Sequence, residues 1–188
     1  MGVPRKVVTR PCYNICMRIL GIDPGIGICG FGLIKTTSRA GAEVLDFGAV
    51  TTTVDAPLPS RLKELYDSLC EVFEQTKPEI VAVEKLFFAK NITTGIAVAE
   101  ARGIVLLVAE QWKLPVYEYT PNEIKKSLTG YGAATKTQIE EMVRIHLNLE
   151  KKPKPDDAAD ALAVAITCSF LYKQGQDNKY KFSNSRRV

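Results

Sequence analysis

Residues 18–35 read RILGIDPGIGICGFGLIK and predict two β-strands joined by a tight turn. The first strand stops at the Asp-Pro-Gly of residues 23–25, and the second strand contains Gly30 and Gly32. A third strand-like run follows at residues 43–50, after a short link rich in turn-forming residues. Such short links favour an antiparallel meander of three neighbouring strands.

The rest of the chain alternates helical and strand-like segments. Ser60 is expected to cap a helix whose apolar residues form one stripe. Capping boxes at Thr120 and Thr135 mark the starts of two later helices. We therefore expect strands at 18–22, 28–35, 43–50, 79–83 and 115–119, and helices from Ser60, at 93–112, from Thr120, from Thr135, and from residue 155 or 156 to about 172.

This order predicts an α/β fold. A mixed five-stranded sheet, with three antiparallel strands followed by parallel ones, would be flanked by helices. We expect one folded domain at residues 17–172 and a disordered basic tail at residues 173–188. Residues 1–16 are expected to be a disordered extension or the product of an upstream start codon. An organelle-targeting peptide is the weaker alternative, since this segment is basic and free of acids.

Composition points to a soluble globular protein, with 46% apolar and 24% charged residues. The five cysteines are scattered without Cys-x-x-Cys spacing, which favours a reduced, cytoplasmic location. The longest apolar stretch, residues 158–172, is too short to span a bilayer. Of the net charge of +4, residues 1–16 carry +3 and residues 173–188 carry +4, which leaves −3 on the body. Overall basicity is therefore weak support for nucleic-acid binding.

Four carboxylates stand at the ends of predicted core elements. Asp23 follows the first strand, and Glu84 follows the strand at residues 79–83. Asp157 and Asp160 lie three residues apart near the start of the last helix, and so on one face of it. Ionised side chains are rarely buried, and the carboxyl ends of strands cluster at one rim of such a sheet. We expect the four acids to converge there.

Carboxylate ligands without histidine or cysteine suit Mg²⁺, with Mn²⁺ as a substitute. Two such ions about 3.5–4 Å apart would activate a water and stabilise the leaving oxygen of a phosphodiester. The acids therefore predict a metal-dependent nuclease. Simpler interpretations stay open for each acid taken alone: an Asp near a helix start is commonly a cap, Asp-Pro-Gly is commonly a turn, and a strand-end Glu is commonly a surface acid. Asp156 is the expected cap.

Three motifs resemble those of the RuvC family of Holliday junction resolvases. They are IDPG at residues 22–25, VEKLFFAKN at residues 83–91 and DAADALA at residues 157–163, within a resemblance that spans about residues 18–172. The resemblance implies an RNase H-like fold, a homodimer, and Mg²⁺-dependent cutting of four-way DNA junctions in recombination and repair. It also implies paired nicks that leave 5′-phosphate and 3′-hydroxyl ends, with the RuvA and RuvB branch-migration complex as partner.

The same resemblance assigns roles to individual residues. The family's catalytic, metal-binding acids fall on Asp23, Glu84, Asp157 and Asp160, although some relatives carry a His at the third position. Phe87 matches a family aromatic that stacks near the junction centre, and Lys125 and Lys136 match family basic residues near the active site. Apart from the resemblance, we expect Lys85, Lys90 and Lys126 to add phosphate contacts. Core packing is the alternative for the aromatic, and simple solvation is the alternative for each lysine. His146, the only histidine, is expected to be structural.

Three other functions stay open. An RNase H-like relative that processes RNA or has lost catalysis would share the fold, but the complete acid set favours activity. A nucleotide-binding module of the sugar-kinase and actin type also joins an Asp to a Gly turn, yet such proteins are generally longer and need a second domain. The third is a DNA-structure binder without enzymatic activity.

Overall fold

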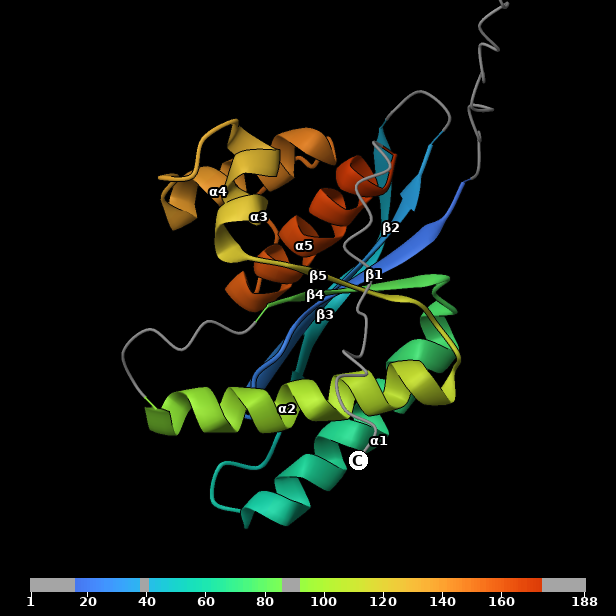
Figure 1. Cartoon of the computed structure of the whole chain (residues 1–188), viewed down its shortest axis with the longest axis vertical. Coiled ribbons are helices and arrows are strands. Elements are labelled where there is room, and N and C mark those ends of the chain that lie inside the picture. Colours follow the sequence, from blue (N-terminus) through green and yellow to red (C-terminus); the bar gives the residue numbers. More distant parts are fainter. Residues whose placement is uncertain (1–15, 38–40, 86–91, 174–188) are drawn as a thin grey trace, which may run out of the picture.

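A five-stranded sheet forms the centre of the molecule (Figure 1). The computed structural model describes residues 16–37, 41–85 and 92–173. The strands follow the order β3-β2-β1-β4-β5; β2 is antiparallel to both neighbours, whereas β1, β4 and β5 are parallel. This topology confirms the predicted mixed sheet. The strands are β1 (Arg18–Asp23), β2 (Ile28–Thr36), β3 (Ala42–Thr51), β4 (Ile80–Glu84) and β5 (Val116–Tyr119).

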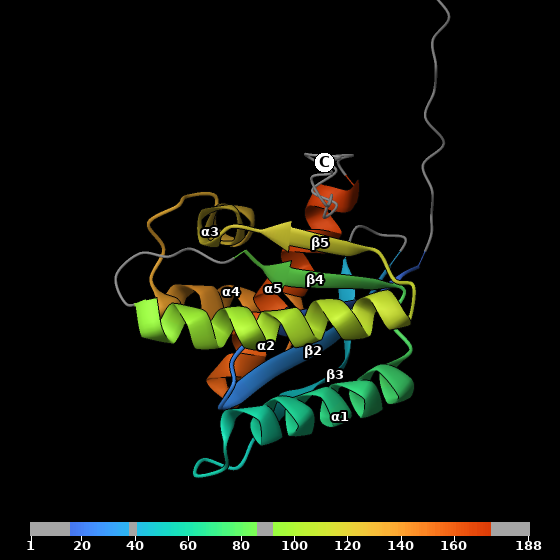
Figure 2. The same cartoon turned by 60° about the horizontal axis from the view of Figure 1, so that its bottom comes forward.

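Helices cover both faces of the sheet (Figures 1 and 2). One face carries α1 and α2, and the other carries α5 with α3 and α4 beside it. The helices are α1 (Leu58–Thr76), α2 (Ile92–Gln111), α3 (Pro121–Thr129), α4 (Lys136–His146) and α5 (Asp156–Lys173). None of the described helices is long and apolar enough to cross a membrane.

Each face of the sheet has its own hydrophobic core. Side chains alternate along a strand, so Ile19 of β1 is buried with α5 while Leu20 is buried with α1 and α2. The central strand β4 repeats this pattern with Ile80 and Val81. Burial on both faces explains the uninterrupted apolar runs from which these strands were predicted.

Three glycines let α5 approach the sheet closely. We call Gly21 of β1 together with Gly30 and Gly32 of β2 the glycine stripe. A Cβ atom at Gly21 would lie 2.0 Å from the carbonyl oxygen of Ala161, and one at Gly30 would lie 2.1 Å from that of Asp157. Real side chains cannot sit at such distances, so the backbone of α5 rests directly on β1 and β2. This contact fixes the height of α5 above the sheet.

Both predicted capping boxes are present. The side chain of Thr120 accepts a hydrogen bond from the Glu123 N–H, and the side chain of Thr135 accepts one from the Gln138 N–H. In each box the side chain of the third helical residue accepts a hydrogen bond from the backbone N–H of the threonine. The starts of α3 and α4 are therefore fixed by local sequence.

The predicted cap of the first helix is wrong. Helix α1 begins at Leu58 with Pro57 at the cap position, so Ser60 is already the third helical residue. The physical reason is Pro59. A proline in the first turn loses no intrahelical hydrogen bond, and its fixed φ suits the helix, so α1 begins before the predicted cap.

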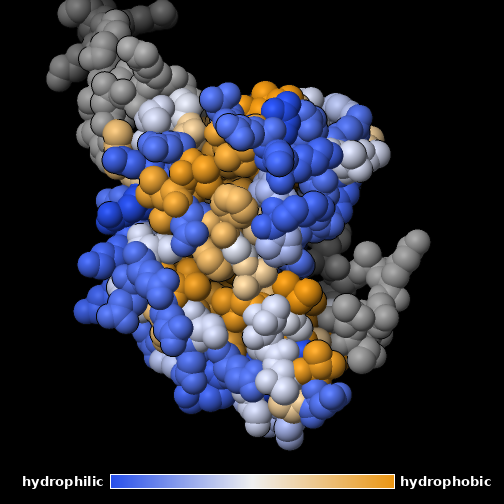
Figure 3. All heavy atoms as spheres, turned by 180° about the vertical axis from the view of Figure 1, so that it is seen from behind, coloured by the Kyte–Doolittle hydropathy of each residue, from blue (hydrophilic) through white to orange (hydrophobic). Residues whose placement is uncertain are grey.

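Some apolar side chains reach the surface. Seen from behind, the molecule carries an apolar band between polar flanks (Figure 3). Helix α2 lies on the opposite side, toward the viewer in Figure 1. On it, Ala101 and Val105 are fully buried, whereas Ile96 and Leu107 are about half exposed, at 52% and 48%. The sequence of this helix is apolar almost all round between Ile96 and Ala109, which is typical of a helix buried on more than one side, against the sheet and against a partner subunit. Within this chain its outward face stays open to further contacts.

Candidate active site

Asp23 and Glu84 lie side by side at the ends of two parallel strands. Ile22 of β1 pairs with Val83 of β4, so the next residue on each strand reaches the same rim of the sheet. Both acids are partly buried. The neighbouring strand ends expected from the sequence are therefore present, and they supply two of the four predicted acids.

Helix α5 brings Asp157 and Asp160 to this rim. Asp23 pairs with Gly30 on β2, and Gly30 is the glycine over which the backbone of Asp157 lies. Asp160 follows almost one helical turn later and is also partly buried. The glycine stripe thus determines how close the acids of the helix come to those of the strands.

The four acids interact electrostatically. The pKa of Asp23 is raised to about 7, first by burial and then by the negative charges of Asp160, Glu84 and Asp157, while the positive charge of Lys136 lowers it. Burial is also the main reason why the pKa of Glu84 is raised, with Asp160 next. The pKa of Asp160 is raised by burial as well. Carboxylates that disfavour one another's charged form attract a compensating cation.

Lysine side chains supply part of that compensation. The Lys136 ammonium lies 3.1 Å from Asp160 Oδ2, and this hydrogen bond is the main cause of the raised pKa of Lys136. The positive charge of Lys125 lowers the pKa of Glu84 against the effect of burial. Two of the predicted DNA-binding lysines therefore face the acids from α3 and from the first residue of α4.

Asp156 has a different environment from the two acids that follow it. Its carboxylate pairs with Lys154 and lies 3.9 Å from Lys136. The prediction that Asp156 caps the helix is wrong by one residue: it is the first helical residue, and the carbonyl of Pro155 accepts the first helical bonds from Ala158 and Ala159. Proline cannot donate a hydrogen bond but keeps its carbonyl, so it can fill this position.

The carboxylate oxygens of the site are suitable ligands for a hard divalent cation. However, they do not lie close enough together to form a complete coordination shell. Across residues 16–37, 41–85 and 92–173, no three His, Cys, Asp or Glu side chains come together tightly enough to hold a metal ion. The acids are nevertheless near enough to raise the pKa of Asp23. Oxygen ligands and crowded negative charge are the conditions that Mg²⁺ and Mn²⁺ favour.

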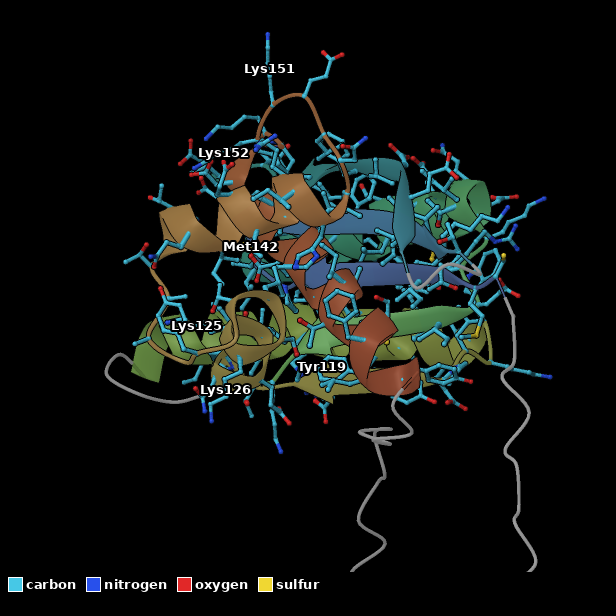
Figure 4. The ribbon with its side chains drawn as sticks, turned by 90° about the horizontal axis from the view of Figure 1, so that it is seen from above. Tyr119, Lys125, Lys126, Met142, Lys151 and Lys152 are labelled. Atoms are coloured by element: carbon cyan, nitrogen blue, oxygen red, sulfur yellow. The ribbon has the colours of Figure 1, made fainter. Side chains whose placement is uncertain are left out.

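The other predicted DNA-binding residues lie in the segment after β4 and on α3. Lys85 is exposed directly after Glu84, and its backbone N–H donates to the Tyr119 carbonyl. Phe87 and Lys90 lie outside the described residues. Figure 2 shows α3 on the side of the molecule at which α2 begins, and Lys125 and Lys126 extend from α3 (Figure 4).

His146 is a packed residue, as expected. Its ring makes an edge-on contact with Phe170 at 5.2 Å between centroids, and Nε2 lies 3.3 Å from the Leu128 carbonyl oxygen. These contacts join α4 to α3 and α5. The histidine therefore contributes to the core around α5, apart from the four acids.

Sequence reasoning missed one signal that was visible in the printed sequence. Gly30 and Gly32 were noted only as glycines inside a strand, and Gly21 was not interpreted. A Gly-x-Gly in one strand, opposite another glycine in its neighbour, indicates close approach of a backbone. Reading that signal requires the β1–β2 register, in which Gly21 pairs with Gly32.

Comparison with known proteins identifies the family. Residues 19–168 match the family model described as crossover junction endodeoxyribonuclease RuvC. The chain belongs to the RuvC family. It is 46% identical over 165 residues to RuvC of Caldicellulosiruptor saccharolyticus, across 85% of this chain and 99% of that protein. It is 50% identical over 149 residues to RuvC of Thermotoga petrophila, across 79% and 90% of the two chains.

A solved RuvC structure has the same fold. Thermus thermophilus RuvC in complex with Holliday junction substrate aligns with a TM-score of 0.82 and 35% sequence identity, covering 87% of this chain and 99% of that one. This similarity confirms the predicted RNase H-like fold, and the match to the RuvC family model confirms the resemblance drawn from the three motifs.

Proposed function

We propose that this protein resolves four-way DNA junctions by hydrolysing phosphodiester bonds at the four-acid cluster. The observation that carries the proposal is the meeting of Asp23 and Glu84 with the acids of α5: burial first, and then the charges of the other three acids, raise the pKa of Asp23 to about 7. Membership of a family of crossover junction endodeoxyribonucleases supports it. So does the Thermus thermophilus relative, whose structure contains Holliday junction substrate.

Asp23, Glu84, Asp157 and Asp160 would hold Mg²⁺, with two ions per subunit and Mn²⁺ as a substitute. When bound, such ions activate the attacking water and stabilise the charge on the leaving oxygen. The all-oxygen donor set supports this choice of metal. The half-buried carboxylates would orient their oxygens without the entropy loss of ordering flexible surface side chains.

The lysines would allow a phosphate to approach an acidic site. Lys136, 3.1 Å from Asp160, and Lys125, which lowers the pKa of Glu84, place positive charge beside the carboxylates. That charge offsets the repulsion between the acids and the DNA backbone. Lys85 and Lys90 would add phosphate contacts, and Phe87 would stack on DNA near the junction centre.

We further propose that the protein acts as a homodimer. Two acid clusters in a symmetric dimer would nick two strands of like polarity and leave 5′-phosphate and 3′-hydroxyl ends. The half-exposed Ile96 and Leu107 on α2 support a contact with a second subunit through that helix. RuvA and RuvB are the proposed partners. The cytoplasmic location inferred from the scattered cysteines, and the domain limits at residues 17 and 172, stay predictions.

One assay tests this function. A synthetic four-way junction and a linear duplex of the same sequence are incubated with the protein, in Mg²⁺ or in EDTA. We expect symmetric cutting of the junction in Mg²⁺, little cutting of the duplex, and none in EDTA. Equal cutting of both substrates would refute junction selectivity, and undiminished cutting in EDTA would refute the metal mechanism. Junction binding without any cutting would favour the non-enzymatic binder.

A further inference from the structure

The connection between α3 and α4 exposes an aromatic side chain that the proposed function has not used. Tyr131 is 46% exposed in a link that runs from Gly130 to Thr135. Exposed tyrosines are unremarkable when they stand alone among neutral neighbours. This one stands in a link between two helices, each of which carries a lysine that faces the acid cluster: Lys125 on α3 and Lys136 on α4.

The backbone around Tyr131 is held in place on both sides. The Thr129 hydroxyl oxygen accepts a hydrogen bond from the Tyr131 N–H at 3.3 Å and lies 2.9 Å from the Tyr131 carbonyl oxygen. Gly130 takes a left-handed conformation with φ of 82°, and its N–H donates to the Lys126 carbonyl. A Cβ at Gly132 would lie 2.1 Å from Asn122 Oδ1, so this glycine allows close packing on α3.

The charges around this link favour a polyanion. Lys125 lowers the pKa of Glu84, and Lys136 bonds Asp160 at the far end of the link. Lys126 is exposed, and its Cε lies 3.5 Å from the position that a Cβ of Gly132 would occupy. Lys136 lies five positions after Tyr131, so their Cα atoms are at most about 18 Å apart. A DNA strand that contacts Lys126, whose Cε lies beside Gly132, therefore runs next to the link that carries Tyr131.

We propose that Tyr131 stacks on an unpaired base of the DNA strand that enters the acid cluster. An aromatic ring flanked by lysines binds single-stranded nucleic acid by stacking on a base while the lysines contact phosphates. The fixed backbone reduces the conformational entropy lost when the ring stacks. The inference rests on the proposed junction resolvase function and adds a second stacking residue, separate from Phe87.

The test compares Tyr131→Ala with Tyr131→Phe, and uses Tyr172→Ala as a matched control. Tyr172 is 39% exposed on α5, twelve residues and so about 18 Å along the helix from Asp160. Junction binding is measured in EDTA, and single-turnover cutting in Mg²⁺. We expect Tyr131→Ala to weaken junction binding about 5- to 150-fold, the range for loss of one base–aromatic stack. Tyr131→Phe and Tyr172→Ala should bind within twofold of the original protein.

Salt dependence separates stacking from charge. We expect Tyr131→Ala to leave the slope of log Kd against log salt unchanged, whereas Lys126→Ala should reduce that slope by about 1. If Tyr131→Ala lowers the melting temperature, Tyr131→Leu takes its place, because it keeps apolar volume but has no ring. Its binding should then be as weak as predicted for the alanine variant.

Two results would overturn the proposal. In the first, Tyr131→Ala or Tyr131→Leu binds and cuts junctions as well as the original protein. In the second, Tyr131→Phe binds junctions as weakly as Tyr131→Ala, which would assign the effect to the hydroxyl. Failure of the original protein to cut junctions would instead refute the proposed function. Normal cutting by the original protein and by Tyr131→Ala alike would refute only the stacking.

Discussion

At the scale of single residues, the first five residues of α5 include three acids in different surroundings. Asp160 is partly buried and bonded by Lys136, and Asp157 lies over Gly30 beside the end of β1. Asp156 pairs with Lys154 at the surface. The role of each acid is therefore determined by the groups that its carboxylate faces, and not by its order along the helix.

Asparagine substitutions distinguish these acids. Asp157→Asn and Asp160→Asn should reduce junction cutting by at least about 100-fold while junction binding in EDTA is kept, because each removes a proposed metal ligand without changing side-chain volume. Asp156→Asn should stay within about threefold, since its carboxylate forms an exposed pair. Single-turnover cutting and gel-shift binding measure the two effects. An inactive Asp156→Asn beside an active Asp157→Asn would show that the assigned acids are off by one position.

Lys136 carries a second prediction at this scale. Lys136→Gln should lower the single-turnover rate roughly 10- to 100-fold, because it removes the positive charge 3.1 Å from Asp160. Lys154→Gln is the matched control, since that lysine pairs with Asp156 instead. Equal rates for the two variants would show that a charge bonded to Asp160 has no special effect on cutting.

At the scale of secondary-structure elements, α5 depends on the glycine stripe. A side chain at Gly30 would meet the backbone of Asp157, and backbone cannot move aside as a flexible side chain can. Gly103 offers the opposite case, because a Cβ there would meet nothing within 4 Å. Substituting alanine at each glycine therefore distinguishes two effects on the free energy of unfolding: a clash with α5 at Gly30, and the lower helix propensity of glycine at Gly103.

An alanine at each position tests this dependence. Gly30→Ala should lower the free energy of unfolding by about 1–3 kcal/mol or more, and should impair cutting, because α5 must shift with its acids. Gly103→Ala should raise the free energy of unfolding by up to about 1 kcal/mol, since alanine favours a helix over glycine. Denaturant unfolding and junction cutting are measured for both. A Gly30→Ala protein as stable and active as the original would contradict direct packing of α5 on β2.

The elements also show what the sequence could predict. Capping boxes at Thr120 and Thr135 are local signals, and the structure contains both. The apolar runs of β1 and β4 showed the strand ends that carry Asp23 and Glu84. The approach of α5 could not be predicted in the same way, because it depends on glycines in two strands and on their register. The contacts of Lys125 and Lys136 with the acids likewise join segments distant in sequence, and only the family resemblance suggested them.

At the scale of the whole molecule, the acid cluster affects stability. Asp23 has an ordinary pKa of 3.8, and its pKa rises to about 7 in the folded protein. Between these values the folded state binds more protons than the unfolded state, so raising the pH destabilises the fold. The pKa shifts of Glu84 and Asp160 act in the same direction. Each unit of pKa shift corresponds to about 1.4 kcal/mol.

This linkage predicts how the melting temperature depends on pH and metal. In EDTA, we expect the contribution of Asp23 to lower the melting temperature as pH rises from 4 to 7, and to level off above that. Asp23→Asn should flatten the decline and raise the melting temperature at pH 8. Mg²⁺ should stabilise the original protein at pH 8 more than the variant, because the cation favours the charged carboxylate. Scanning calorimetry measures these effects. An equally steep decline in Asp23→Asn would show that other groups cause it.

The contact between α5 and the glycine stripe also determines where the chain can tolerate insertions. A helix turns by about 100° and advances 1.5 Å for each residue, so one residue inserted between Ala158 and Ala161 would rotate Asp157 away from the rim while the rest of α5 stayed docked. The same insertion between Asn148 and Lys152 would fall in the loop before the helix and leave the spacing of the acids intact. Length variation among natural relatives should therefore collect before Pro155 and be absent from the first two turns of α5.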